Sequence, residues 1–205
     1  IEARGSAEAE GSRVALSLTA SGVDVHALLR DVAGKDLLEG RGRVTADLRG
    51  QGRTLGALRS SLAGQAAVQL RDGAVKGVNL AQAFRQAKAA LSGRPDALLQ
   101  ARATEKTDFS ELNASARLEG GVASSDDLDL KSPFLRVGGA GRFDIGRGQI
   151  DYTARATVVA VPQGQDAGGL ASLKGVTVPV RLTGPFDAID WKIQWSDVAA
   201  AAVEQ

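Results

Sequence analysis

Alternation of apolar and polar residues along most of the chain is the feature that most constrains its fold. In the segment IDYTARATVVAV, apolar residues occupy every second position from Ile150 to Val158. The segments VTVPVRLTG (176–184) and IDWKIQW (189–195) repeat the same period. Because successive side chains of a strand point to opposite faces of a sheet, this period predicts strands with one apolar and one polar face. From residue 14 onward the alternation predicts about nine such strands.

Short turns between these segments indicate that the strands follow one another as an antiparallel meander. Gly120-Gly121 and Gly146-Arg147-Gly148 separate neighbouring strand patterns, as tight hairpin turns do. Pro179 has no N–H, so its strand is predicted to lie at an edge or to turn the missing donor away from a partner. The expected fold class is mainly β with a few helices: a curved antiparallel β-sheet that forms a β-groove, with two or three short α-helices packed on it.

Two segments, residues 24–32 and 79–92, break the alternation and are predicted to be helical. Residues 55–62 and 196–204 are further candidates for short helices. Asp24 and Asn79 are suited to cap the first turns of the first two segments. The segments 93–106 and 162–174 are predicted to be loops. Because no change of composition divides the chain, residues 1–205 are expected to form a single domain.

Composition and charge exclude several classes of function. Lys and Arg number 25 and Asp and Glu 24, so a net charge of +1 gives no reason to expect a nucleic-acid partner. No apolar run approaches the roughly 18 residues of a membrane-spanning helix, and no signal peptide is expected within these residues. The chain opens at Ile1, which favours a fragment or processed product whose membrane anchor, if it has one, lies upstream. The absence of cysteine excludes disulfides, thiolate metal sites and cysteine nucleophiles.

Residues that could carry catalysis are sparse. His26 is the only histidine, so neither a histidine-rich metal site nor a catalytic triad can be assembled. Asp126, Asp127 and Asp129 lack the glycine and glutamate of a calcium loop and are predicted to belong to a polar hairpin and strand face. The GGAG at 138–141 lacks the strand–turn–helix setting of a dinucleotide site, so its small residues are expected to let strands bend. No enzyme activity, cofactor or metal is predicted.

The predicted helices are too few to cover the apolar face of the predicted sheet. Nine strands spaced about 4.8 Å apart make a sheet roughly 43 Å wide. A helix is about 10 Å across, so two clear helices leave about half of the face uncovered. Such a face can curl on itself, pack against other parts of the protein or hold a ligand. A closed barrel or sandwich would bury the same apolar face without a ligand.

Ordered blocks of the chain resemble the C-terminal region of AsmA-family proteins. The blocks are RDGAVKGVNLAQAFRQAKAAL (71–91), the segment 105–152, LKGVTVPVRLTGPFDAIDWKIQW (173–195) and the segment 22–52. The resemblance implies a Gram-negative protein anchored in the inner membrane by an N-terminal helix, with its bulk in the periplasm. The family is associated with outer-membrane integrity. It is also similar to the larger bridge-like lipid transporters, in which a long curved sheet shields acyl chains.

The resemblance favours two functions and no enzymatic one. In the first, the apolar groove shields phospholipid or other lipid acyl chains during transport between the inner and outer membranes. In the second, the chain is a periplasmic structural or assembly factor that affects outer-membrane protein or lipopolysaccharide biogenesis through contacts with other envelope proteins. A conduit needs an apolar interior that reaches an open end, whereas a scaffold needs a closed one. The residues expected to face lipid are Ile150, Tyr152, Val158, Val176, Val178, Val180, Leu182, Ile189, Trp191, Ile193 and Trp195.

Overall fold

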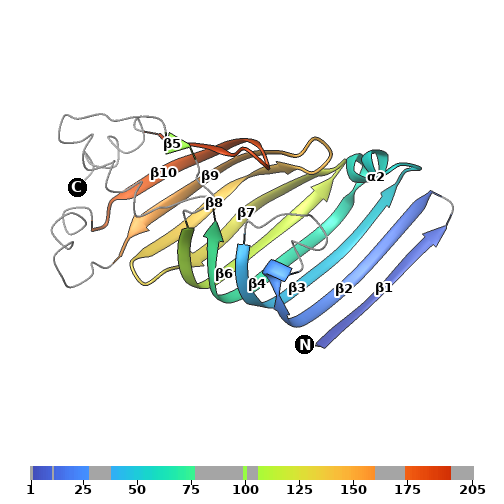
Figure 1. Ribbon diagram of the computed structural model, residues 1–205, viewed down its shortest axis with the longest axis horizontal. Coiled ribbons are helices and arrows are strands. Elements are labelled where there is room, and N and C mark those ends of the chain that lie inside the picture. Colours follow the sequence, from blue (N-terminus) through green and yellow to red (C-terminus); the bar gives the residue numbers. More distant parts are fainter. Residues whose placement is uncertain are drawn as a thin grey trace.

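The described strands form one curved sheet that does not close on itself (Figure 1). The computed structural model describes residues 2–10, 12–27, 38–76, 99–100, 106–159 and 174–194. Eleven strands pair in the order β1-β2-β3-β4-β6-β7-β8-β9-β10-β11-β5, and all neighbours are antiparallel. Since β1 and β5 stand at opposite ends of this order, the sheet is open. The prediction of a mainly β fold with a curved antiparallel sheet is confirmed.

The strands vary in length from two to fourteen residues. They are β1 (Glu2–Glu10), β2 (Arg13–Asp24), β3 (Leu38–Gln51), β4 (Ala63–Lys76), β5 (Leu99–Gln100), β6 (Lys106–Glu119), β7 (Val122–Lys131), β8 (Leu135–Asp144), β9 (Gln149–Val158), β10 (Thr177–Pro185) and β11 (Asp190–Ile193). The helix α2 (Leu55–Ser61) joins β3 to β4. The nine predicted strands correspond to β2–β4 and β6–β11, whereas β1 and β5 were not predicted.

The short strand β5 shows that the chain visits the far edge of the sheet between two central strands. After β4 the chain pairs with β11 through Trp191 opposite Leu99, and it then returns to place β6 beside β4. The loop predicted for 93–106 is therefore wrong at residues 99–100 and at Lys106, which begins β6. Two residues are too few to show a period, and only the partner strand makes them a strand.

Side-chain caps begin the two helical segments of the described chain. Thr54 accepts a hydrogen bond from the Ala57 amide, and α2 confirms the helix predicted near 55–62. Asp24 Oδ1 likewise accepts from the His26 amide at 3.1 Å, and residues 25–27 are helical. The cap predicted at Asp24 is thereby confirmed.

Several predicted segments lie outside the described residues. They are the rest of the first helix (28–32), the helices at 79–92 and 196–204, and the loop at 162–173. Lys174, at the end of that loop, forms an isolated bridge with Val158.

Pro179 lies in an interior strand, so the prediction that its strand is an edge is wrong. β10 pairs with both β9 and β11. The Pro179 carbonyl accepts from the Gln194 amide at 3.0 Å. In an antiparallel ladder the N and C=O of a residue face the same neighbour. The missing Pro179 donor therefore faces Gln194, one position beyond the last β10–β11 pair (Val180–Ile193), and removes no bond to β9.

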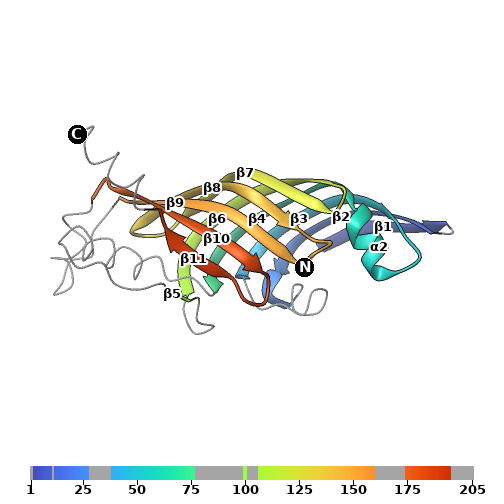
Figure 2. The same cartoon turned by 90° about the horizontal axis from the view of Figure 1, so that it is seen from above.

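The sheet is bowed, and its concave side is apolar. Inward-facing residues alternate with exposed ones along each strand, as in β9, where Ile150, Tyr152 and Ala154 are buried while Asp151 is exposed. Figure 2 shows the bow of the sheet, with α2 projecting on the concave side. Curvature therefore surrounds the apolar face with strands and leaves the polar face outside.

Two glycines differ in what a side chain would meet, and this difference gives opposite predictions. Gly64 has a φ of +136° and an added Cβ would lie 2.0 Å from the Asp47 carbonyl oxygen. Gly56 lies in α2 and an added Cβ would meet nothing within 4 Å. We expect Gly64→Ala to lower the free energy of unfolding by about 2 kcal/mol or more, and Gly56→Ala to raise it by about 0.5–1 kcal/mol. Urea unfolding of both variants measures the two changes in the free energy of unfolding. Equal changes in the two variants would contradict the prediction.

Candidate functional site

Apolar side chains form continuous rows across the concave face. Strand register places the inward-facing residues of neighbouring strands opposite one another. One row crosses β4, β6, β7, β8, β9 and β10 and contains Leu70, Leu112, Leu130, Val137, Ala156 and Val178. A second row, nearer to α2, contains Leu16, Leu48, Gly64, Leu118, Ala123, Phe143 and Ile150. The concave side is therefore one apolar surface from β2 to β10.

Burial is greatest toward the strand ends that lie away from α2 and toward the C-terminal strands. There the side chains pack into a group that we term the buried cluster. It contains Val25, Leu70, Phe109, Leu112, Leu130, Leu135, Val137, Ala154, Ala156, Val158, Val178, Val180 and Trp191. Leu70 is 1% exposed and Val178 is 0% exposed, so this part of the face serves as a hydrophobic core.

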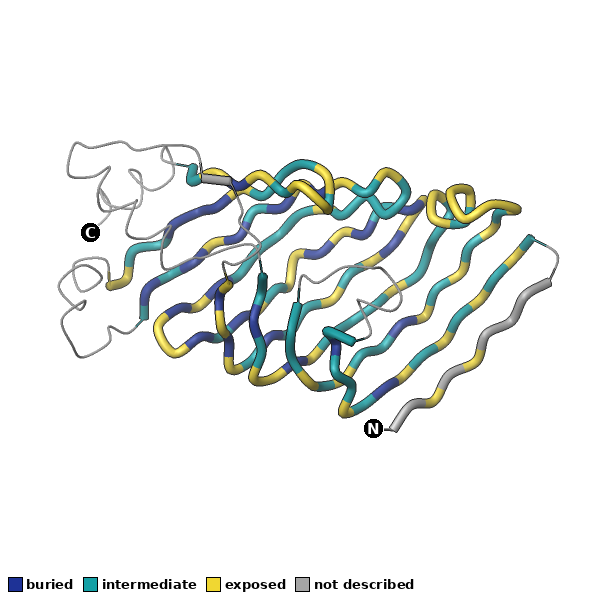
Figure 3. The backbone as a smooth tube through the Cα atoms, viewed as in Figure 1, coloured by how far each residue is buried: buried dark blue, intermediate teal, exposed yellow. Residues whose placement is uncertain are grey.

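The apolar side chains nearest to α2 on β2, β3 and β4 are only partly covered. We term them the open stripe: Val14, Leu16, Leu18, Leu48 and Ala66. They are intermediate in exposure and none belongs to the buried cluster. Figure 3 shows this difference between the intermediate and exposed positions of β2 and the buried positions of β10. An apolar surface left partly exposed in this way is where a ligand has most to contact.

The residues predicted to face lipid that belong to β9, β10 and β11 lie on the concave face, and most of them are already buried. Ile150, Tyr152, Val158, Val178, Val180 and Trp191 are buried, whereas Val176, Leu182, Ile189 and Ile193 are partly buried. Trp195 lies outside the described residues. That these side chains contact lipid stays a prediction.

The open stripe was missed as a site, although its alternation is present in the sequence. The segment VALSLTA (14–20) has the same period of two as the C-terminal strands. Periodicity identifies the face on which a side chain lies but not what covers that face. The degree of exposure therefore needed the structure.

The aromatic ring of Tyr152 fits on the concave face because glycines lie beside it on β8. An added Cβ at Gly139 would lie 2.5 Å from the Tyr152 ring, and one at Gly141 would lie 2.4 Å from the Asp151 carbonyl oxygen. The glycines at 138–141 thus make room for an aromatic side chain. Burial raises the pKa of the Tyr152 hydroxyl, and its hydrogen bond with Ser125 partly opposes that rise.

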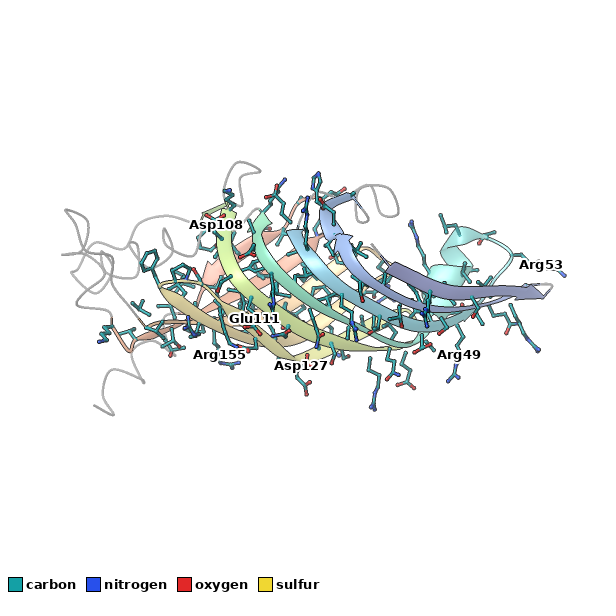
Figure 4. All side chains as sticks on the ribbon, turned by 90° about the horizontal axis from the view of Figure 1, so that it is seen from below. Arg49, Arg53, Asp108, Glu111, Asp127 and Arg155 are labelled. Atoms are coloured by element: carbon teal, nitrogen blue, oxygen red, sulfur yellow. The ribbon has the colours of Figure 1, made fainter. Side chains whose placement is uncertain are left out.

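The convex face is polar and carries cross-strand ion pairs. Arg181 forms two hydrogen bonds to Asp151, at 3.1 and 3.2 Å, and this contact raises the pKa of the guanidinium. Lys131 lies 3.2 Å from Glu111, whose pKa is lowered by its hydrogen bonds with Asn113 and Lys131. Figure 4 shows Arg49, Asp127 and Arg155 along this outer side. The two faces therefore differ sharply, with ionic groups facing water.

A one-residue bulge in β7 is completed by the carboxylate of Asp127. The register of β7 shifts against β8 between Ser125 and Leu128, and against β6 between Ser124 and Asp129. Asp127 Oδ1 accepts from the Ser115 amide at 2.8 Å, and Oδ2 accepts from the Ser115 hydroxyl. These bonds lower the pKa of Asp127. The acidic segment 126–129 thus belongs to a strand, as the sequence predicted, and its bulge is closed by a side chain.

We expect Asp127→Ala to lower the free energy of unfolding by about 1 kcal/mol, since two exposed charge-assisted hydrogen bonds are lost. A carboxylate with a lowered folded-state pKa stabilises the fold above its unfolded pKa, and this contribution is lost as pH falls through the folded value. The difference from wild type should therefore vanish in acid. Asp126→Ala is the control, because that exposed side chain forms no hydrogen bond with another described residue. If the difference in the free energy of unfolding between Asp127→Ala and wild type did not change with pH, the ionised Asp127 carboxylate would not be its origin.

Nothing within the described ranges assembles a metal centre. No group of three or more His, Asp or Glu side chains there could hold a metal ion. His26 lies in the helical turn after β2, where its amide is used by the Asp24 cap. No helix among the described residues is long and apolar enough to cross a membrane. The concave apolar surface is thus the feature of the described chain that calls for a function.

Comparison with known proteins gives one match. The model of the AsmA family matches residues 1–128, which is more than half of the chain. The match ends within β7, so it includes the whole of the open stripe. No curated protein and no solved structure matches the chain.

Proposed function

This chain belongs to the AsmA family of bacterial envelope proteins, and from that premise we propose that its concave face shields lipid acyl chains from water. In this proposal the protein is not an enzyme and lies in the periplasm. The ligands are phospholipids in transit between the inner and outer membranes. Family membership supports an envelope role in outer-membrane assembly, and the geometry of the sheet supports the finer proposal.

The observation that carries the proposal is an apolar surface that is continuous but only partly covered. Rows of apolar side chains run from β2 to β10 without a charged interruption. Leu16, Leu18 and Leu48 stay partly exposed along the part of that surface next to α2. Burying apolar area contributes about 25 cal/mol per Å², so an acyl chain that covers these side chains is stabilised by contacts with no need of polar recognition.

A second function is favoured by the free edge of β1. This strand pairs with β2 over nine residues, and its other edge has no partner among the described strands. An edge strand presents unpaired N–H and C=O groups to which another chain can add a strand. An assembly factor that binds envelope proteins through β1 is therefore the alternative. It does not use the open stripe, and this separates the two functions experimentally.

Binding of a fluorescent phospholipid to the purified chain tests the proposal. The probe carries its fluorophore on an acyl chain, so transfer into an apolar site increases its emission. We expect saturable binding that unlabelled phospholipid displaces. Emission that does not saturate, or that the unlabelled lipid leaves unchanged, would contradict acyl-chain shielding and favour the assembly factor.

A further inference from the structure

The helix α2 exposes an apolar side chain to water. None of its residues is buried, and Leu55 is 63% exposed. Among the described residues, Phe134 at 40% is the other large hydrophobic side chain that is exposed. Neither the buried cluster nor the open stripe contains Leu55. An exposed leucine on a short surface helix needs a reason beyond the stability of the fold.

Glycines hold α2 close against the concave side of the sheet. An added Cβ at Gly50 would lie 2.8 Å from a Leu58 methyl group, and one at Gly52 would lie 2.4 Å from the Leu58 amide. Gly121 is equally close to the Arg59 carbonyl oxygen, at 2.5 Å. Leu58 therefore points toward the sheet and anchors α2. Leu55, which precedes it by three residues, remains exposed at the rim next to the open stripe.

Two exposed arginines flank this leucine in the sequence. Arg53 precedes it by two residues and Arg59 follows it by four, and neither forms an ion pair with another described residue. On the convex face of the same strand ends lie the exposed arginines Arg13, Arg49, Arg117 and Arg142, and Arg147 lies in the turn after β8.

Around α2 the acidic side chains are fewer: Glu119 is exposed, Asp47 accepts a hydrogen bond from Ser17, and Asp144 pairs with Arg147 at 3.6 Å. Farther from α2 along the same strand ends, Glu10 stands opposite Arg13 in the β1–β2 register, and Asp187 is exposed in the turn after β10. The part of the rim around α2 therefore carries more positive than negative side chains.

From this juxtaposition we infer that the rim formed by α2 and its flanking arginines binds the surface of an anionic phospholipid bilayer. Leu55 inserts among the lipids while Arg53 and Arg59 contact headgroup phosphates. Leucine beside arginine is the combination by which surface helices bind anionic lipid interfaces. Charge complementarity favours an anionic partner, because arginines outnumber acids around α2, and the exposed Leu55 favours a partner with an apolar interior, as a bilayer has. The rim lies next to the open stripe. A bilayer bound to the rim would therefore lie where acyl chains pass from the bilayer into the groove.

Sedimentation with vesicles tests this inference on the purified chain. We expect binding to vesicles of phosphatidylglycerol and phosphatidylethanolamine that weakens as salt is added, and much weaker binding to phosphatidylcholine vesicles. Leu55→Ser should reduce binding about tenfold, and the double variant Arg53→Gln with Arg59→Gln about thirtyfold. Circular dichroism checks that each variant is folded.

Phe134→Ser is the matched control, because it removes an exposed apolar side chain at the opposite strand ends. It should leave vesicle binding unchanged. Equal loss in Phe134→Ser and Leu55→Ser, or absence of binding to any vesicle, would overturn the inference and leave a protein partner for this rim. The inference does not depend on acyl-chain shielding. Leu55→Ser should still bind monomeric fluorescent phospholipid, and a chain that binds vesicles but no monomeric lipid would contradict only the proposed function.

Discussion

Replacing Leu70 with alanine should lower the free energy of unfolding by about 3 kcal/mol. Leu70 is 1% exposed and lies in the central strand β4, within the row that crosses the sheet to Val178. Deleting buried methyl groups removes their burial free energy and leaves a cavity, and together these effects amount to about 2–5 kcal/mol. Urea-induced unfolding of wild type and variant at one pH measures the difference.

The neighbouring residue provides the control for this prediction. Gln69 is exposed on the convex face of the same strand, opposite Arg43 and Asn113. Gln69→Ala should change the free energy of unfolding by less than about 0.5 kcal/mol. If both alanine variants unfolded at the same urea concentration, the concave face would not be the core of the fold. The sheet would then have no buried face to contrast with its exposed one.

Replacing Leu48 with glutamate should weaken binding of a fluorescent phospholipid by about tenfold to a hundredfold. Leu48 belongs to the open stripe and lies opposite Leu16, so an acyl chain on this part of the face contacts both side chains. Losing a leucine contact costs about 1.5–3 kcal/mol, and each 1.4 kcal/mol is a factor of about ten in affinity. An ionised carboxylate adds to this loss, because the lipid would have to desolvate it. Fluorescence titration of the folded variant measures the change.

The adjacent residue of β3 again gives the control. Arg49 is exposed on the convex face, so Arg49→Glu introduces the same side chain one position along the strand. Its affinity for phospholipid should stay within about twofold of wild type, because an exposed charge is screened by water and salt. Equal losses from the two substitutions would indicate that charge, and not the apolar contact, governs binding.

The fold was largely predictable from the sequence because its dominant signal is local. A period of two needs only neighbouring residues, and it identified nine strands and the face on which each side chain lies. The caps at Asp24 and Thr54 follow from side-chain chemistry at a single position. Two strands were not predicted, and each has a physical reason. β5 is two residues long, and β1 (EARGSAEAE) has no large apolar side chain to mark a buried face.

The candidate site was less predictable because exposure depends on distant parts of the chain. Tyr152 and Leu48 each lie between two polar residues, yet Tyr152 is 5% exposed and Leu48 is partly open. Pro179 was misplaced for the same reason, since β11 pairs with β10 at a distance that a local pattern does not encode. The arginine rim at α2 also arises from strand ends that only the fold brings together.

Photo-crosslinking in bacterial cells that express the full-length protein tests the central claim most directly. The photo-reactive residue is placed at Leu16 or Leu48 on the concave face, and at Ala15 or Arg49 on the convex face of the same strands. Adducts are identified by phospholipid labelling and by mass. The account predicts phospholipid adducts at Leu16 and Leu48 and none at Ala15 and Arg49. Protein adducts without lipid at the concave positions, or equal lipid labelling of both faces, would contradict acyl-chain shielding.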